Sequence, residues 1–406
     1  MGCIILKSSS NIGFIGAVCS FAAVYAASSA PIPLYTIYQQ QMNMTHADLS
    51  LSSVLYFVGT VIALLFLPRL SDFCGRKPII IASLILASAG CLLFVFMEQS
   101  ETFLLGRFVQ GLSCGLGSAC LSAYIADLAK GKTAAAVVTS APMIGLAAGP
   151  FASAALIQYG LFMEFIYIIL LAVMVVCAVF IILGKETSKA APGALRSLLP
   201  KVSAPKNIRR FLPAASAVFV GTWAIGGFYQ AFSAPIAAEQ LGTGSLLIAA
   251  AVFSCLQAPN IIGSTAAGKI ASPSAQKIGM IGFFFSTAAM VISLGSGAVI
   301  AFLLSSAFCG ICWGMAYTGT LHEILTRITP AQRAGVLSTI YIISYSGATV
   351  PNLIVSRLGG GFNLYEIGLG YAVLVFITCA LTLILRAGHA KDKDEVKKEL
   401  KITGSI

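Results

Sequence analysis

The segment LPRLSDFCGRKP, residues 67–78, carries the cations Arg69, Arg76 and Lys77 and the carboxylate Asp72. On both sides the chain has no charged residue for about twenty positions, the length of helix that crosses the hydrocarbon core of a bilayer. Charged side chains are costly inside that core and are tolerated where water or lipid headgroups reach them. The segment is therefore predicted to be a short polar loop between two membrane-spanning helices.

The composition of the 406-residue chain supports an integral membrane protein. Hydrophobic residues make up 58% of the chain and charged residues 10%, whereas a soluble domain carries roughly 25% charged residues. The formal net charge of +11 could favour nucleic acid, but the cations stand in short blocks between apolar runs. Such blocks are typical of loops that face an anionic leaflet, so the predicted partner is a lipid bilayer and not a nucleic acid.

Apolar runs long enough to cross a membrane recur along the whole chain. They predict twelve spans, near 12–36, 48–68, 79–97, 102–126, 134–157, 162–183, 211–236, 243–267, 275–294, 297–321, 332–355 and 363–386. The cation-rich segments fall on one side of these spans, which the positive-inside rule makes the cytoplasm. We therefore expect a multi-pass protein of the cell (inner) membrane with both termini cytoplasmic.

The two halves of the chain resemble each other. FLLGRFVQGLSCG (103–115) aligns with FLLSSAFCGICWG (302–314), GLAAGP (145–150) with SGATVP (346–351), and PRLSDFCGRK (68–77) with GKIASPSAQK (268–277), at offsets of 199 to 201 residues. Such repeats build transporters from two bundles around a site near the bilayer midplane. The predicted organisation is a six-helix bundle (1–183), a cytoplasmic linker (184–210), a second six-helix bundle (211–386) and a cytoplasmic tail (387–406), an all-α membrane fold with two pseudo-symmetric halves.

Three motifs give the chain a resemblance to a known family over nearly its whole length. PRLSDFCGRK is similar to the loop motif Gly-x-Leu-x-Asp-x-x-Gly-Arg-Lys, with Pro68 at its first glycine. RFVQG (107–111) is similar to the fourth-span motif Arg-x-x-Gln-Gly, and GLAAGPFASA (145–154) to the exporters' fifth-span motif Gly-x-x-x-Gly-Pro-x-x-Gly-Gly. By these motifs the chain resembles the major facilitator superfamily, in particular its twelve-helix drug:proton antiporters.

The resemblance implies a secondary active transporter that works by alternating access. The expected activity is proton-coupled export of a small amphipathic organic compound, a drug or a metabolite, so multidrug efflux by an antiporter. Import or exchange of a small organic metabolite or anion on the same fold is the alternative. A membrane receptor or scaffold is a third interpretation, but it would not need duplicated halves. The expected partners are a small-molecule substrate and protons, and we expect a monomer.

The loop motif is predicted to form a conformational gate from Asp72, Gly75, Arg76 and Lys77. Asp72 is expected to accept hydrogen bonds from backbone N–H groups at a helix start and to attract Arg76. Gly75 is expected to form the turn, and Lys77 to reach the lipid headgroups. The alternative is that these charges serve topology alone. In the second half Ser272 and Gln276 replace the charges, so the gate is predicted on one half only.

Arg107, with Gln110 beside it in the motif, is the one cation predicted inside a span. An arginine in hydrocarbon should face a cavity or a partner, and the resemblance ties it to proton coupling. Two interpretations stay open: a structural ion pair, or contact with an anionic group of the substrate. No carboxylate lies in the middle of the first span, so the proton-carrying residue is not identified.

Gly145, Gly149 and Pro150 carry the exporter-type motif. Small residues four positions apart let helices approach closely, and proline bends a helix. The family role implied is to seal or bend the contact between the halves, and the alternative is ordinary helix packing.

The cavity is predicted from aromatic and amide residues inside spans, because apolar walls with a few polar groups suit a small amphipathic ligand. The candidates for the cavity lining are Tyr25, Tyr229, Gln257, Asn260, Trp313 and Tyr317, within a wider set that adds Tyr56, Trp223, Gln230, Tyr341 and Tyr345. Trp313 and Tyr317, one helical turn apart, are the first choice.

The sequence shows no pattern of an enzyme. The three histidines have no metal-ligand spacing, and no Gly-x-x-x-x-Gly-Lys loop is present. The eleven cysteines fall mostly within apolar runs, where they are expected to pack between helices. We therefore expect no catalytic residues, no metal and no cofactor.

Overall fold

The computed structural model describes residues 2–129, 132–200, 202–358 and 361–402, and these residues are helical apart from turns and connecting segments. The first half contains α1 (Gly2–Ser29), η1 (Ile32–Leu34), α2 (Tyr35–Met42), α3 (His46–Phe66), α4 (Leu70–Cys74), α5 (Arg76–Val95), α6 (Ser100–Leu128), α7 (Lys132–Gln158) and α8 (Glu164–Leu183). The second half contains α11 (Leu212–Pro235), η2 (Ile236–Gln240), α12 (Leu246–Gln257), α13 (Asn260–Ala267), α14 (Ser272–Gly295), α15 (Val299–Leu325), α16 (Pro330–Leu358) and α17 (Leu364–Ile402). Between them lie α9 (Ala194–Ser197) and α10 (Lys206–Arg209).

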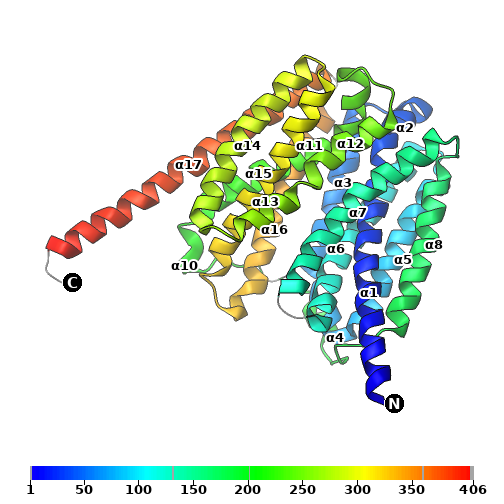
Figure 1. Ribbon diagram of the computed structural model, residues 1–406, viewed down its shortest axis with the longest axis horizontal. Helices are drawn as coiled ribbons and strands as arrows, with labels where there is room; N and C mark the ends of the chain where they lie inside the picture. Colours follow the sequence, from blue (N-terminus) through cyan, green and yellow to red (C-terminus); the bar gives the residue numbers. More distant parts are fainter. Residues whose placement is uncertain (1, 130–131, 201, 359–360, 403–406) are drawn as a thin grey trace.

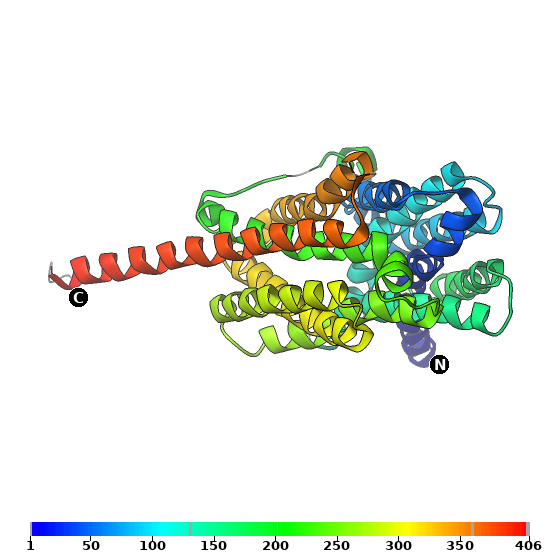
Figure 2. The same ribbon diagram turned by 90° about the horizontal axis from the view of Figure 1, so that it is seen from above.

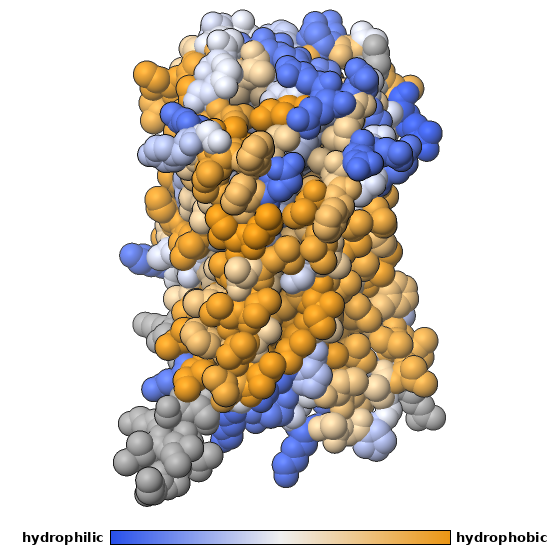
Figure 3. Space-filling model, turned by 90° about the vertical axis from the view of Figure 1, so that its right-hand side faces the viewer, coloured by the Kyte–Doolittle hydropathy of each residue, from blue (hydrophilic) through white to orange (hydrophobic). Residues whose placement is uncertain are grey.

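The predicted spans correspond to helices of the structure. Eleven helical segments of the described residues are long and apolar enough to cross a membrane. The remaining predicted span, 332–355, is the 29-residue helix α16, which carries more polar residues. Figure 3 shows hydrophobic side chains in a belt between two hydrophilic ends. The all-α membrane fold predicted from the sequence is confirmed.

Proline interrupts two of the predicted spans. The first span breaks at Pro31 and Pro33 into α1, η1 and α2, and the eighth breaks at Pro259 into α12 and α13. A proline has no N–H to donate within a helix, so the chain bends there. The twelfth apolar span ends at Ala387, close to its predicted end, but the helix α17 that contains it continues to Ile402.

The helices form two groups that lie side by side, α1–α8 and α11–α17 (Figures 1 and 2). Between the groups, α16 packs against α3 and α12 packs against α7. We call the end with α4 and α10 the linker end and the opposite end, with α2, the α2 end (Figure 1). The contacts between the two groups of helices position the site described below.

Close helix contacts repeat in the two halves. A Cβ atom added at Gly111 of α6 would lie 2.0 Å from the carbonyl oxygen of Tyr56, and one at Gly310 of α15 would lie 2.2 Å from that of Leu256. Gly111 and Gly310 are about 200 positions apart in the chain, and so are their partners Tyr56 and Leu256. The sequence duplication therefore corresponds to a duplicated packing of helices.

Candidate functional site

Among the described residues, the hydrogen bonds and ion pairs between the two groups of helices lie at the α2 end and in the middle. His46 Nε2 is 3.1 Å from Glu239 Oε2, and Asn352 Nδ2 donates to Ser53 Oγ at 3.3 Å. Nearer the middle, a serine of α12 donates to a backbone oxygen of α7. At the linker end, a hollow of about 300 Å³ separates α3, the connection after it and α6 from α16. This arrangement is closed at the α2 end.

A central cavity of about 160 Å³ lies between the two groups. The first half contributes side chains from α1, α3 and α7, and the second half from α11, α12, α13, α15 and α16. The lining residues are Tyr25, Tyr56, Phe57, Met143, Leu146, Trp223, Gly226, Gln230, Gln257, Asn260, Trp313, Tyr317 and Tyr345. None of them carries a charge.

Of the six candidates for the lining, the structure places Tyr25, Gln257, Asn260, Trp313 and Tyr317 at the cavity. Tyr229 is not among the lining residues, so its expected place at the cavity is corrected. It is fully buried, its hydroxyl is 2.5 Å from Ser306 Oγ, and its ring stacks on Phe302. Tyr229 therefore packs α11 against α15.

Four lining residues are not among the Tyr, Trp, Gln and Asn candidates of the sequence analysis: Phe57, Met143, Leu146 and Gly226. Three are ordinary apolar side chains, which many lipid-facing positions also carry. A Cβ atom at Gly226 would lie 2.7 Å from the indole of Trp313, so this glycine leaves the space that the indole occupies. No feature of the sequence alone distinguishes such positions.

The polar groups of the cavity are mostly unpaired within the protein. Tyr25 shares a hydrogen bond with Ser118 at 2.6 Å. Gln230 and Gln257 are each 7% exposed, and neither amide forms a hydrogen bond with another described residue. The indole N–H of Trp223 is buried without a partner. A buried polar group normally has a partner, so these groups are available to a bound molecule.

Arg107 lies behind the cavity and is fully buried. Its Nη1 donates to Ser28 O and to Gln110 Oε1, both at 2.6 Å, and Gln110 in turn donates to Ala27 O at 2.8 Å. The guanidinium lies 4.7 Å from the ring centroid of Tyr56, which lines the cavity. Among the described residues no carboxylate forms an ion pair with Arg107, and its Nε and Nη2 have no partner. The structural ion pair considered from the sequence is absent from these contacts.

The loop motif forms a cluster of ionic contacts at the linker end. Arg76 Nη1 is 2.5 Å from Asp72 Oδ1, and Arg76 Nε is 3.1 Å from Asp127 Oδ2. Gly75 has φ +94°, a backbone conformation that favours glycine. The expected pairing of Asp72 with Arg76 and the expected turn at Gly75 are therefore both present in the geometry.

Two details of the motif differ from expectation. The backbone N–H groups of Arg76 and Lys77 donate to the carboxylate of Glu186, at 2.9 and 3.0 Å, and not to Asp72. The ammonium of Lys77 donates to the carbonyls of Ile182 and Gly184, at the end of α8, two contacts that the expectation did not include. These partners lie at the end of α8 and in the segment directly after it, which the motif itself does not contain.

The predicted linker 184–210 is attached to both halves. Arg69 donates to the carbonyls of Ser197 and Leu199, at 3.0 and 2.8 Å. Further along, Ser203 N donates to Gly335 O of α16 at 3.2 Å. The segment thus connects the loop motif to the second half.

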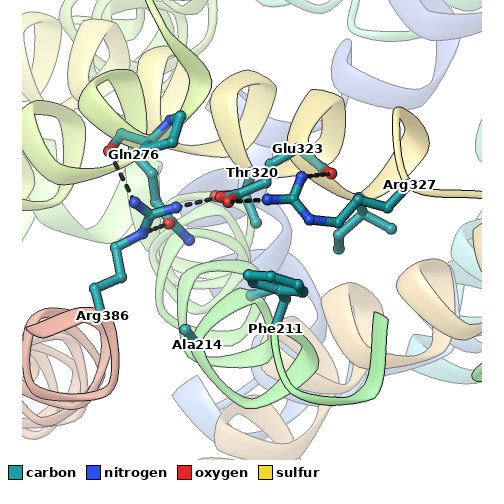
Figure 4. A pocket seen from close by; sticks show the side chains of 10 residues that line it. Phe211, Ala214, Gln276, Thr320, Glu323, Arg327 and Arg386 are labelled. Atoms are coloured by element: carbon teal, nitrogen blue, oxygen red, sulfur yellow. Dashed lines mark hydrogen bonds and ion pairs between the residues drawn. The ribbon is translucent and has the colours of Figure 1, made fainter. Parts of the chain in front are cut away.

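The second half has an ionic cluster of its own, which the sequence alignment did not predict. Glu323 of α15 pairs with Arg327 at 3.2 Å and with Arg386 of α17, and Arg386 also donates to Gln276 (Figure 4). These side chains line a pocket of about 190 Å³ together with Phe211. An ionic cluster is therefore present in each half, although the charges of the loop motif itself occur in the first half only.

The two clusters have opposite charge patterns. Arg327 and Arg386 stand 200 positions after Asp127 and Glu186 of the first cluster. The first cluster surrounds a cation, Arg76, with carboxylates, while the second surrounds a carboxylate with cations. The alignment missed this reversal because the charges come from helices outside the aligned loop.

Gly145 and Gly149 face α1 within the first half. Added Cβ atoms would lie 2.1 Å from Ala22 O and 2.3 Å from Ala26 O. These contacts lie within the first half and match the alternative of ordinary helix packing between α7 and α1. Pro150 lies inside α7, which contains a second proline at residue 142.

No group of three His, Cys, Asp or Glu side chains within the described residues has the arrangement of a metal site. The ten cysteines described are all free.

Comparison with known proteins gives the family. The family model described as Major Facilitator Superfamily matches residues 14–351. The chain belongs to the major facilitator superfamily. Members of this superfamily are transporters, so the chain is a multi-pass membrane protein of a transporter family.

Curated relatives in the superfamily match a part of the chain. The uridine/deoxyuridine transporter of Lactococcus lactis subsp. cremoris is 33% identical over 120 residues, 28% of this chain and 25% of that protein. The multidrug resistance protein MdtL of Klebsiella pneumoniae is 33% identical over 102 residues, 24% of this chain and 26% of that protein. MdtL of Shigella flexneri is 37% identical over 105 residues, with the same shares. The matched region spans about a quarter of the length of each relative.

Proposed function

We propose that the protein is a secondary active transporter that exports a small organic compound by alternating access. The observation that carries the proposal is the central cavity: both halves line it, and the polar contacts between the halves concentrate at the α2 end. Rocking of two halves about a central site is the established way such folds expose it to either side. The structure then corresponds to a state closed at the α2 end.

Direction and coupling are further parts of the proposal. The fifth-span motif and the similarity to MdtL multidrug resistance proteins support export with a proton as the coupling ion. No carboxylate lines the cavity. The protonatable pair that joins the two halves is His46 with Glu239, so protons would act on the contact between the halves.

The orientation follows from charge. The linker end carries the cation-rich segments, and by the positive-inside rule this supports a cytoplasmic linker end in a protein of the inner membrane. Both termini then lie in the cytoplasm, the four domains with the boundaries given above are part of the proposal, and the cavity is lined by residues of one chain, in keeping with a monomer. In this orientation Asp72, Gly75, Arg76 and Lys77 form a cytoplasmic gate.

Everted membrane vesicles test the proposal. We expect uptake of a transported compound into such vesicles when a proton gradient is imposed, and loss of uptake when an uncoupler dissipates the gradient. Flux that is unchanged by the uncoupler would reject proton antiport. The absence of flux for every compound in a panel would reject transport.

Import or exchange is the second candidate function. The cavity combines three amide side chains with aromatic rings and no charge, and one relative is a uridine/deoxyuridine transporter. Accumulation of a labelled nucleoside by intact cells that express the protein would favour import over export.

A further inference from the structure

We propose that the central cavity binds an uncharged, planar heterocyclic ring whose edge carries a hydrogen-bond donor beside an acceptor, and that Gln230 and Gln257 recognise this edge. The proposal rests on the transport function proposed above and names the class of its substrate. Four features of the cavity lead to it: its unpaired amides, its aromatic walls, its lack of charge and its size.

The amides supply the hydrogen bonds. Gln230 on α11 and Gln257 on α12 both line the cavity and are more than nine-tenths buried, and neither amide forms a hydrogen bond with a described residue. A primary amide presents a C=O acceptor and an N–H donor side by side. This pair matches the donor–acceptor edge of a nucleobase-like ring in a bidentate contact. The third amide, Asn260, already accepts a hydrogen bond from Ser264 at 3.2 Å.

The aromatic walls favour a flat ligand. Trp223 lies 4.4 Å from Tyr345 and 6.0 Å from Trp313, measured between ring centroids. Phe57, from the first half, lies 5.8 Å from Tyr345. Aromatic rings pack against another planar ring by stacked or edge-to-face contacts. The buried indole N–H of Trp223, which has no partner, adds a donor to the same wall.

Charge and size restrict the ligand further. No lining residue is charged, and the ring of Tyr56 lies between the cavity and the guanidinium of Arg107. A permanently charged ligand would be desolvated without a counter-charge. The cavity of about 160 Å³ is close to the roughly 150 Å³ of an engineered cavity that holds one benzene molecule. In this conformation it accommodates one ring with small substituents.

Tryptophan fluorescence gives a direct test. The chain contains two tryptophans, and both line the cavity, so the intrinsic emission of the purified full-length protein reports on this site. Uracil is the probe, because it is a single uncharged ring with N–H groups next to carbonyls. We expect saturable quenching by uracil, and binding about tenfold or more weaker for orotate, which is uracil with an added carboxylate.

Variants test the role of the amides. Gln230→Leu and Gln257→Leu should each weaken uracil binding about tenfold or more, because a bidentate contact is lost. Gln158→Leu, at an exposed position at the end of α7, is the matched control and should bind like the wild type. Gln257→Glu keeps the side-chain volume and should also weaken binding, which covers the case in which a leucine variant fails to fold.

The failures of the two proposals are distinguishable. Quenching by tetraphenylphosphonium, a lipophilic cation, with none by uracil, or equal binding of uracil and orotate, would overturn the ligand class. Unchanged uracil binding in the folded glutamine variants would overturn the role of the amides. The fluorescence measurement needs no gradient, so normal quenching without flux in vesicles would reject transport and leave the ligand class standing.

Discussion

Replacement of Glu323 by glutamine tests whether the ionic cluster of the second half stabilises the fold. The carboxylate of Glu323 accepts from Arg327, two residues past the end of α15, and from Arg386 in the middle of α17, so it ties the end of α15 to α17. Glu323→Gln keeps the volume of the side chain but leaves two arginines without their counter-charge. We expect a large loss of stability from this single exchange.

The magnitude follows from burial. The Glu323 side chain is 9% exposed, and removal of one partner from a buried ion pair costs about 3–5 kcal/mol. The two arginines are 30% and 20% exposed, so water recovers part of their solvation and the expected loss is about 2–4 kcal/mol. Asp72 is 51% exposed, and exposed pairs contribute about 0–1 kcal/mol. The two clusters should therefore differ clearly in their effect on stability.

A thermal unfolding experiment on the purified protein measures the difference. Cys91, Cys114, Cys120 and Cys309 are buried, so a thiol-reactive dye reports the temperature at which the fold opens. Glu323→Gln should lower the midpoint by several degrees, while Glu98→Gln, an exposed control at the α2 end, should leave it unchanged. The double variant Glu323→Gln with Arg386→Gln should recover part of the loss, because one uncompensated charge is removed.

Two results would refute this reasoning. One is a wild-type midpoint for Glu323→Gln, which would mean that the arginines do not need the carboxylate. The other is a double variant less stable than Glu323→Gln by the full effect of Arg386→Gln alone, which would mean that the two residues act independently.

Three further predictions follow from individual contacts. Asp72→Asn should change the free energy of unfolding by less than about 1 kcal/mol yet depress flux in vesicles, and normal flux at normal expression would contradict the gate. Gly111→Ala should destabilise the fold by about 1–3 kcal/mol through overpacking, since the added Cβ would meet the Tyr56 carbonyl; an unchanged unfolding midpoint would count against this contact. Tyr229→Phe removes the hydrogen bond to Ser306 and should cost about 0.5–1.5 kcal/mol without a change in uracil binding, whereas weaker binding would return Tyr229 to the cavity.

The sequence identified most of the cavity residues but could not assign all their directions. Side chains were chosen because aromatic and amide groups are rare inside spans, and this chemical criterion holds for Gln257 and Trp313. It failed for Tyr229, whose neighbour Ser306 lies 77 positions away. Whether a tyrosine faces a cavity or a neighbouring helix depends on how helices rotate against one another, which local sequence does not specify.

The sequence by itself determined the membrane class, the positions of the spans and the family. These properties depend on the length of apolar runs and on short motifs, which are local. The tertiary structure alone decided the partners of the charged residues. Glu186 meets the start of α5 from 110 positions away, and Arg386 meets Glu323 from 63 positions away. Such contacts form only when segments distant in the chain pack together. The segment LPRLSDFCGRKP therefore shows where charged residues lie, but not which residues elsewhere in the chain pair with them.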